Sequence, residues 1–414
     1  MRHVRSFARI LFLSGAAALL VSCQGPASTV LASAKQRVVQ TTARNGDRDG
    51  HRGRDIPSDG QFIFRHWTFG DESFWTDTLG LNQVVEQGVS PKVALSVGLK
   101  VDAERLPPGL LASADLSSPK TTVELLRRDA VVGVEGDITA DGHIRRLGIT
   151  CALCHSTVDN SVAPGIGRRV DGLPNHDLNV GAIVALSPAL PASARAVFNS
   201  WGPGKYDAEF NRDGINSPVV IPPALGLKGV ERETYTAEGP VSYWNAYVAV
   251  TQMHGHGDFS DPGLGINIHQ RPDLVTPVLG PLREYQLHLP VPQPAAGSFD
   301  PASAARGAAL FATSGKCASC HIPSQHFTDV NVSRKGQLTL HSPAEVCTDS
   351  VRAIRLKNHA YRTTPLRALA LHAPYFHDGS AATLLDVVQH YDQCMSLGLS
   401  PQEEADLAEY LKTR

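Results

Sequence analysis

Two cysteines and a histidine occur twice in the order Cys-x-x-Cys-His, with the same spacing in both copies. This pentad is the attachment motif of c-type haem, because both thiols can add to the vinyl groups of one porphyrin. The adjacent imidazole then lies beneath the iron as its proximal ligand. The residues concerned are Cys151, Cys154 and His155 in the first copy and Cys317, Cys320 and His321 in the second.

Zinc ribbons and dithiol redox sites also contain Cys-x-x-Cys, but both fit this chain less well. A ribbon has its second cysteine pair roughly 15–20 residues after the first, whereas the pairs here are far apart. A thioredoxin-like dithiol needs no histidine after the pair. With 7 Cys and 17 His in 414 residues, chance would give roughly 0.005 such pentads per chain. The sequence therefore predicts two covalently bound haem c groups.

The N-terminal residues resemble a bacterial export signal. Three arginines within the first nine residues precede an apolar run at residues 10–21, which is too short to span a bilayer. The run ends in Leu-Val-Ser-Cys, which resembles a lipobox whose cysteine, here Cys23, becomes the lipid-modified first residue. An ordinary secretory signal cleaved nearby is the alternative. Residues 1–22 are therefore predicted to be a signal peptide of the lipoprotein type.

Export agrees with the haem motifs, since c-type haem is attached outside the cytoplasm in bacteria. We expect a periplasmic protein that a lipid on Cys23 anchors to the membrane. Residues 23–60 contain almost no large apolar side chains after residue 39. Such a segment cannot bury enough surface to fold, so it would form a flexible tether.

The net charge excludes little. The formal charge is −2, and removing the three signal arginines from the 38 Lys+Arg leaves 35 against 40 Asp+Glu, or −5. No basic stripe suggests nucleic acid, and we expect none as a partner. The roughly 350 residues beyond the tether are enough for two or three domains.

Two cysteines, Cys347 and Cys394, are left after the haem and lipid sites are counted. An oxidising compartment favours a disulfide between them. Two buried thiols that pack as small apolar side chains are the alternative. The sequence alone leaves both open, because it does not show whether the two Cα atoms lie within bonding range.

Residues 61–290 are expected to form an N-terminal haem domain with many loops and a β-hairpin. Residues 131–138 and 144–150 have the pattern of strands, and Asp141-Gly142 between them favours a hairpin turn. This hairpin leads directly into the first haem motif. Short helices are expected at residues 177–186, 192–201 and 242–253.

Residues 303–414 have the pattern of a compact cytochrome c domain, and a proline-rich linker at 291–302 precedes them. A helix is expected at 302–311, one loop before the second haem motif. Ser400 and Glu403 have the spacing of a capping box at the start of a final helix. The predicted fold is mainly α, with two cytochrome c-like haem domains.

Three short motifs in this last third carry a family resemblance. They are Thr-Pro-Leu-Arg from residue 364, Ala-Pro-Tyr-Phe-His-Asp-Gly from residue 373, and Thr-Leu followed by Val-Val-Gln-His-Tyr ending at Tyr391. In order and spacing they resemble the diheme cytochrome c peroxidase superfamily, which includes the enzyme that matures methylamine dehydrogenase. The resemblance covers about residues 303–412. Over residues 61–290 it is much weaker.

The resemblance implies that the C-terminal haem relays electrons and has a distal ligand on the helix after the His-Asp-Gly turn. The matching residue is Tyr391, where most members have methionine and the methylamine dehydrogenase-maturing enzyme has tyrosine. A phenolate oxygen would favour ferric and higher-valent iron, because a hard anionic ligand stabilises high charge. Met395, one helical turn later, is the competing ligand. Packing of both side chains in the core is the third interpretation.

The resemblance also implies that peroxide reacts at the N-terminal haem, where an acid/base group must move a proton between the two oxygens. Members of the superfamily use a distal glutamate and carry a removable histidine ligand, and no motif places either one here. His176 lies about where the histidine would fall. A second candidate patch consists of His254, His256 and Asp258, which could equally be an ordinary polar surface loop.

Three further side chains have open roles. His377 is a potential iron ligand, although the Asp-Gly that follows it favours a structural histidine bonded to a carbonyl or a propionate. Trp201 and Trp244 could assist electron transfer between the haems, and core packing is the alternative for each.

These features predict a peroxidase-like oxidoreductase. It would take peroxide or another small oxidant, and a donor such as a small cytochrome or a cupredoxin would reduce it. A non-enzymatic electron-transfer cytochrome is the alternative, with iron ligands among His176, Met253, His254, Tyr391 and Met395. A diheme oxygenase is a third reading. A calcium ion between the domains is compatible with the resemblance, but no residue pattern points to it.

Overall fold

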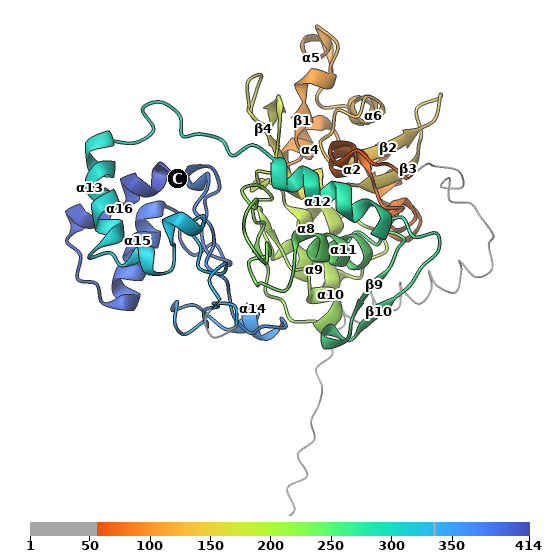
Figure 1. Ribbon diagram of the computed structural model, residues 1–414. Coiled ribbons are helices and arrows are strands. Elements are labelled where there is room, and N and C mark those ends of the chain that lie inside the picture. The colour runs from red at the N-terminus through yellow and green to blue at the C-terminus, as the bar shows by residue number, and fades with distance from the viewer. Residues whose placement is uncertain (1–55, 334–336) are drawn as a thin grey trace, which may run out of the picture.

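A computed structural model describes residues 56–333 and 337–414 (Figure 1). The predicted signal peptide (1–22), the lipid site at Cys23 and most of the predicted tether lie outside these residues. The first helix, α2 (Gly60–His66), begins where folded structure was expected to start, and Asp59 caps it by accepting from the amide of Gln61. Within the described residues, no helix combines the length and the apolar character that a bilayer crossing requires.

The part before the linker is built from short helices and very short strands. Its remaining helices are α3 (Leu81–Gly88), α4 (Pro91–Ser96), α5 (Leu110–Ser113), α6 (Pro119–Arg127), α7 (Ala152–His155), α8 (Val180–Val184), α9 (Ala192–Asn199), α10 (Phe210–Asp213), α11 (Val241–Thr251) and α12 (Leu279–His288). The strands are β1 (Val101–Asp102), β2 (Val134–Ile138), β3 (Ile144–Ile149), β4 (Ser156–Val158), β5 (Ile166–Gly167), β6 (Arg169–Asp171), β7 (Lys205–Tyr206), β8 (Val219–Val220), β9 (Phe259–Asp261) and β10 (Ile266–Ile268).

Most strands pair with a strand close in sequence, and the β1–β5 pair is an exception. In the described chain the strands form two-stranded sheets, of which β1–β5 is parallel and β2–β3, β4–β6, β7–β8 and β9–β10 are antiparallel. The mainly helical class predicted from the sequence is therefore confirmed at that coarse level. The predicted hairpin is β2–β3, with Val134 opposite Ile149.

Three predicted helices are present but shorter or differently capped. The helix expected at 177–186 is reduced to α8, because Asn179 caps it by accepting from the amide of Ala182. The helix expected at 192–201 ends at Asn199. The helix expected from Ser242 begins one residue earlier, after Pro240, so Ser242 is not its cap.

The C-terminal part contains α13 (Pro301–Ala312), α14 (Val351–Ile354), α15 (Leu384–Met395) and α16 (Pro401–Lys412). Residues 289–300 between α12 and α13 form an extended connection, which Figure 1 shows bridging the two halves of the molecule. The capping box predicted at Ser400 and Glu403 is present. Helices α13 and α16 cross at Gly307, where an added Cβ would lie 1.9 Å from the carbonyl oxygen of Asp406.

Most apolar core clusters of the described chain lie within one half, and a smaller one, of Leu173, Leu225, Leu289 and Ala368, joins the two halves. Two clusters of buried side chains lie before the linker, one around Leu126 and Phe198 and one around Phe64 and Tyr247. A third cluster lies entirely after the linker, where Phe311 packs with side chains of α15 and α16.

The two halves are joined by buried ion pairs. Arg352 on α14 pairs with Glu209, and both side chains are 1% exposed. Arg355 Nη2 lies 2.8 Å from Asp207 Oδ1, and its Nε lies 2.7 Å from Asp213 Oδ2. A buried charge without its partner is strongly destabilising. These pairs therefore hold α14 against the N-terminal half. Figure 1 shows α14 near α10.

Cys347 and Cys394 form a disulfide, with Cα atoms 5.9 Å apart. Of the two alternatives left by the sequence, the structure has the disulfide and not two buried thiols. The bond connects the last turn of α15 to the loop that follows His341. A second contact joins the same two segments, since His390 Nε2 on α15 lies 3.0 Å from the carbonyl oxygen of Val346. Both contacts hold α15 in place.

Replacing Cys347 and Cys394 by serine should lower the free energy of unfolding by about 4 kcal/mol, because the bond closes a loop of 47 residues and removes entropy from the unfolded chain. Denaturant unfolding of the haem-loaded variant and wild type measures the difference. Arg145→Gln, which breaks the exposed ion pair between Arg145 and Asp137, is the substitution control. It should change the free energy of unfolding by less than about 0.5 kcal/mol. A double-serine variant as stable as that control would contradict the prediction.

Candidate functional site

The first Cys-x-x-Cys-His motif is positioned by the β2–β3 hairpin. The strands pair up to Ile149, and the amide of Thr150 then donates to the carbonyl of Gly133, so the chain enters α7 directly. Gly133 has a φ of +76°, and an added Cβ would lie 2.0 Å from the amide nitrogen of Leu153. Only glycine allows this close approach. The hairpin therefore holds the motif against the N-terminal core.

His155 has the geometry of a proximal ligand. Its Nδ1 lies 3.1 Å from the carbonyl oxygen of Pro222, which accepts a hydrogen bond. The proton is therefore on Nδ1, and Nε2 retains its lone pair for a metal. Burial lowers the pKa of His155 to about 4, which keeps the ring neutral. Burial also raises the pKa of the Cys151 and Cys154 thiols to about 12.

The second motif repeats this arrangement on an unrelated segment. Cys317 begins a single 3₁₀ turn, and His321 Nδ1 lies 3.1 Å from the carbonyl oxygen of Phe327. Burial lowers the pKa of His321 and raises that of Cys317 to about 11. In both motifs a backbone carbonyl thus orients the imidazole through Nδ1, which suits a proximal haem ligand.

One continuous cavity joins the two motifs. His155 lines it from the N-terminal half, and Cys317, Cys320 and His321 line it from the C-terminal half. Many of the other lining side chains are leucines, valines and prolines, which suit an apolar macrocycle. The residues present fit haem at the second motif, whose two thiols and histidine all line the cavity, while the first motif contributes His155 to the lining.

Both candidate distal ligands, Tyr391 and Met395, line this cavity from α15. Burial, followed by the Cys320 and Cys317 thiols, raises the pKa of Tyr391 to about 12. Its ring also contacts Phe376 edge-on, with 5.9 Å between the centroids. Met395 is 38% exposed at the helix end. The more enclosed of the two candidates is therefore Tyr391.

The four predicted candidates for the N-terminal distal site lie elsewhere. His176 has Nδ1 2.5 Å from the carbonyl oxygen of Ala373 and Nε2 3.2 Å from that of Ile221. His254 stacks on Phe74, with 3.6 Å between the ring centroids. None of these residues, nor the other two candidates, is among those that line the cavity.

The remaining two candidates of that patch have structural partners. His256 Nδ1 lies 2.7 Å from the carbonyl oxygen of Pro272. Asp258 pairs with Arg271 at 2.6 Å, and this hydrogen bond is the main reason that its pKa is lowered to about 2. The loop therefore has its own network of contacts, outside the cavity.

Two aromatic candidates are separated by the structure. Trp201 packs in the first N-terminal core cluster and donates to Asn216. Trp244 on α11 lines the cavity, with the guanidinium of Arg352 5.6 Å from its ring centroid.

His377 also lines the cavity, and its Nε2 lies 3.1 Å from a carboxylate oxygen of Asp349. This partner is a side-chain carboxylate rather than a backbone carbonyl.

Glu233 is a site residue that the sequence did not reveal. It is 5% exposed and is the one carboxylate among the described residues that line the cavity. Its Oε2 accepts from the amide of Val241 at 2.6 Å, and Arg283 forms an ion pair with the carboxylate. The sequence pattern that could have indicated Glu233 is an acidic residue a few positions before the start of a helix. This pattern is too common to identify a site residue.

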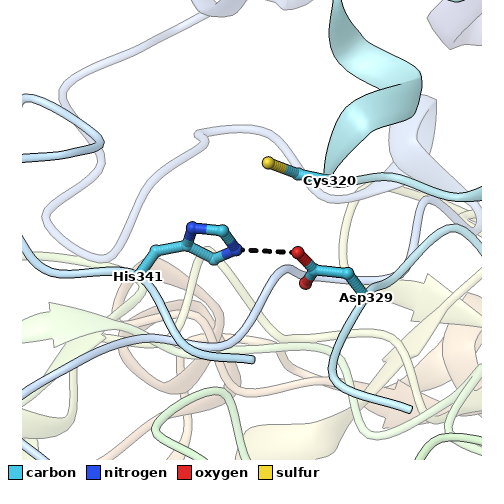
Figure 2. A group of neighbouring side chains, drawn as sticks. All are labelled: Cys320, Asp329 and His341. Atoms are coloured by element: carbon cyan, nitrogen blue, oxygen red, sulfur yellow. Dashed lines mark hydrogen bonds and ion pairs between the residues drawn. The ribbon is translucent and has the colours of Figure 1, made fainter. Parts of the chain in front are cut away.

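Cys320, Asp329 and His341 form a further cluster at the second motif, with ligand atoms within 4.8 Å of one another (Figure 2). His341 Nε2 lies 3.0 Å from Asp329 and Nδ1 2.9 Å from Glu345. Chiefly because of the hydrogen bond with Asp329, the pKa of His341 is raised to about 9. Cys320 belongs to the haem motif, so the cluster is an ion pair beside that motif. A sulfur and an imidazole also differ from the all-oxygen shell that calcium prefers.

Sequence comparison finds similarity to two methylamine utilization proteins named MauG. The chain is 32% identical over 127 residues to the protein of Methylorubrum extorquens and 35% identical over 126 residues to that of Methylophilus methylotrophus. Each match covers 27% of this chain, and 34% and 36% of the two relatives respectively. The chain thus matches about a third of the length of these relatives. No protein-family model matches the chain.

Among solved structures, a MauG-like protein associated with microbial copper homeostasis is 20% identical, with 34% of this chain and 54% of that chain covered and a TM-score of 0.28. Hydrazine synthase of Kuenenia stuttgartiensis is 20% identical, with 48% and 73% covered and a TM-score of 0.29. No shared fold follows from TM-scores this low. The MauG matches in sequence confirm the resemblance to the diheme cytochrome c peroxidase superfamily for part of the chain.

Proposed function

We propose that this chain is an exported diheme c-type cytochrome that acts as a peroxidase-like oxidoreductase. The observation that carries the proposal is the single cavity lined by both motif histidines, His155 and His321, together with Tyr391. Haems attached at the two motifs would share one protein-enclosed space, which favours electron transfer between them. The partial similarity to MauG proteins supports the same class of redox protein.

In this proposal Cys151, Cys154 and His155 would hold the haem at which peroxide is reduced. The motif that ends in His321 would hold the haem that relays electrons. When bound, the haems supply the iron centres at which peroxide is reduced and electrons are held. Reduction of one peroxide to two waters consumes two electrons and two protons. The electrons come from a donor protein such as a small cytochrome or a cupredoxin, by way of the C-terminal half.

We propose Glu233 as the group that moves the proton, because it is the one carboxylate among the described residues that line the shared cavity. Its carboxylate is held by the Val241 amide and by Arg283 at the wall of the cavity that His155 also lines. A carboxylate in that position accepts a proton from the inner oxygen of peroxide and returns it to the outer one, so that the leaving group is water. His155 contributes orientation, because its bond to Pro222 fixes the plane of the ring.

Tyr391 is proposed as the distal ligand of the C-terminal haem, with Met395 as the alternative. Its phenol oxygen is the hard ligand that stabilises ferric iron. The disulfide at Cys394, three residues further along the same helix, keeps this face of α15 toward the cavity. We also propose that the lipid on Cys23 anchors the protein on the periplasmic side of a membrane.

Electron paramagnetic resonance of the oxidised protein and of a Tyr391→Phe variant tests the proposal. The wild type should show one high-spin and one low-spin ferric iron. The variant should change the signal of the C-terminal iron alone, because only that iron loses a ligand. Met395→Leu is the matched control on the same helix and should leave both signals unchanged.

One outcome would overturn the proposed activity. If the ferric spectrum lacks a high-spin component and the half-reduced protein does not turn over peroxide, both irons have two axial ligands. The chain would then be an electron-transfer cytochrome without peroxidase activity.

A further inference from the structure

Arg362 is a buried cation that forms no direct ion pair with an acidic side chain of the described residues. It is 6% exposed and lines the cavity shared by the two haem motifs. All of its hydrogen bonds within the described chain go to backbone carbonyls. Nε lies 2.9 Å from Thr234 and 3.1 Å from Arg232, Nη2 lies 2.7 Å from Glu233, and Nη1 lies 3.2 Å from Thr363.

Two other buried arginines show what is missing. Arg352 and Arg355, seven to ten residues earlier in the chain, are as buried as Arg362, and each forms an ion pair with one or more carboxylates. The carboxylate of Glu233 interacts electrostatically with Arg362 but forms its ion pair with Arg283. Carbonyl dipoles satisfy N–H groups but do not neutralise a full charge.

The cost of this arrangement indicates a partner from outside the polypeptide. An isolated buried charge is strongly unfavourable unless an opposite charge accompanies it. Burial lowers the pKa of Arg362 to about 10, which reflects the same lack of compensation. A guanidinium has five N–H groups, and one on each of Nη1 and Nη2 remains available for an acceptor in the cavity.

Haem is an anionic occupant of suitable chemistry, because it carries two propionate carboxylates. Guanidinium and carboxylate form short, bidentate, charge-assisted hydrogen bonds. The carbonyl of Thr363 accepts from Arg362 and also from the hydroxyl of Thr328. Thr328 follows Phe327, whose carbonyl oxygen lies 3.1 Å from His321 Nδ1. The relevant haem is therefore the one at the second motif.

We propose that Arg362 anchors a propionate of the C-terminal haem and neutralises its charge. This inference rests on the proposed haem attachment at that motif. It adds a role in setting the reduction potential, since a cation beside the propionate favours ferrous iron over ferric iron. It also couples the haem to the N-terminal half, because the same guanidinium is held by the carbonyls of residues 232–234.

Potentiometric titration of the haem-loaded Arg362→Gln variant tests the inference, with visible absorbance and paramagnetic resonance reporting each haem separately. The ferric–ferrous equilibrium of the C-terminal haem should shift about tenfold toward ferric, which corresponds to a potential about 59 mV lower for one electron. Arg362→Lys keeps the charge and should retain most of the wild-type potential. Arg145→Gln removes a charge from the exposed hairpin and should change neither haem.

A second readout does not depend on potential. Resonance Raman spectra should show a shifted propionate bending mode in Arg362→Gln and not in Arg145→Gln. Unchanged potentials together with an unchanged propionate mode would overturn the inference, as would a shift confined to the N-terminal haem. Mass spectrometry of the wild type and of each variant distinguishes failure of this inference from failure of the proposed function. A wild type without covalent haem would overturn the proposed function itself.

Discussion

Replacing Glu233 by glutamine should slow the reaction with peroxide by about 10²–10⁴-fold, the range that a positioned acid/base group contributes. Glutamine keeps the size of the side chain and can still accept from the Val241 amide, but it cannot take up a proton. The binding of a neutral diatomic ligand such as carbon monoxide should remain close to wild type, because it requires no proton transfer. Stopped-flow absorbance after mixing with peroxide measures the first rate.

Glu238 provides the matched control for this change. It is 8% exposed and accepts from the hydroxyl of Thr236 at 3.1 Å and from the amide of Lys357 at 3.3 Å, but it does not line the cavity. Glu238→Gln should therefore react with peroxide at the wild-type rate. If both variants are slowed equally, the effect reflects a general disturbance of this region. If neither is slowed, Glu233 is not the acid/base group.

Features that depend on local spacing were accessible from the sequence. The two haem motifs, the β2–β3 hairpin and the Ser400–Glu403 capping box are each encoded within a few consecutive residues, and the structure contains the hairpin and the box. Local patterns were less reliable at helix ends. Asn179 shortened one helix and Pro240 advanced the start of another, because a strong cap or a proline decides the first turn.

Features that depend on distant parts of the chain were not accessible. Arg352 pairs with Glu209 across 143 residues of sequence, and Arg362 contacts carbonyls about 130 residues away. Glu233 becomes a cavity residue only because the C-terminal half closes against it. The patch at His254 stays a prediction: its histidines are close together in the sequence, and in the structure the ring of His254 stacks on Phe74.

Removing the thiols of one motif should remove one haem and leave the other attached. The Cys317→Ala, Cys320→Ala double variant should therefore carry half the haem of the wild type, because each motif binds its own porphyrin through two thioether bonds. Intact-protein mass spectrometry and haem staining after denaturing electrophoresis measure the loss. The Cys151→Ala, Cys154→Ala variant is the reciprocal test and should show the same stoichiometry.

The two variants should differ in what they retain, since the proposal gives the two haems different tasks. Without the C-terminal haem, the signal that depends on Tyr391 should disappear, while ligands should still bind at the iron held by His155. Without the N-terminal haem, the Tyr391-dependent signal should persist and the rapid peroxide reaction should be lost. A Tyr391-dependent signal that survives removal of Cys317 and Cys320 would contradict the assigned roles. An unmodified wild-type mass would contradict haem attachment itself, because every role proposed for His155, His321 and Arg362 requires a covalently bound porphyrin.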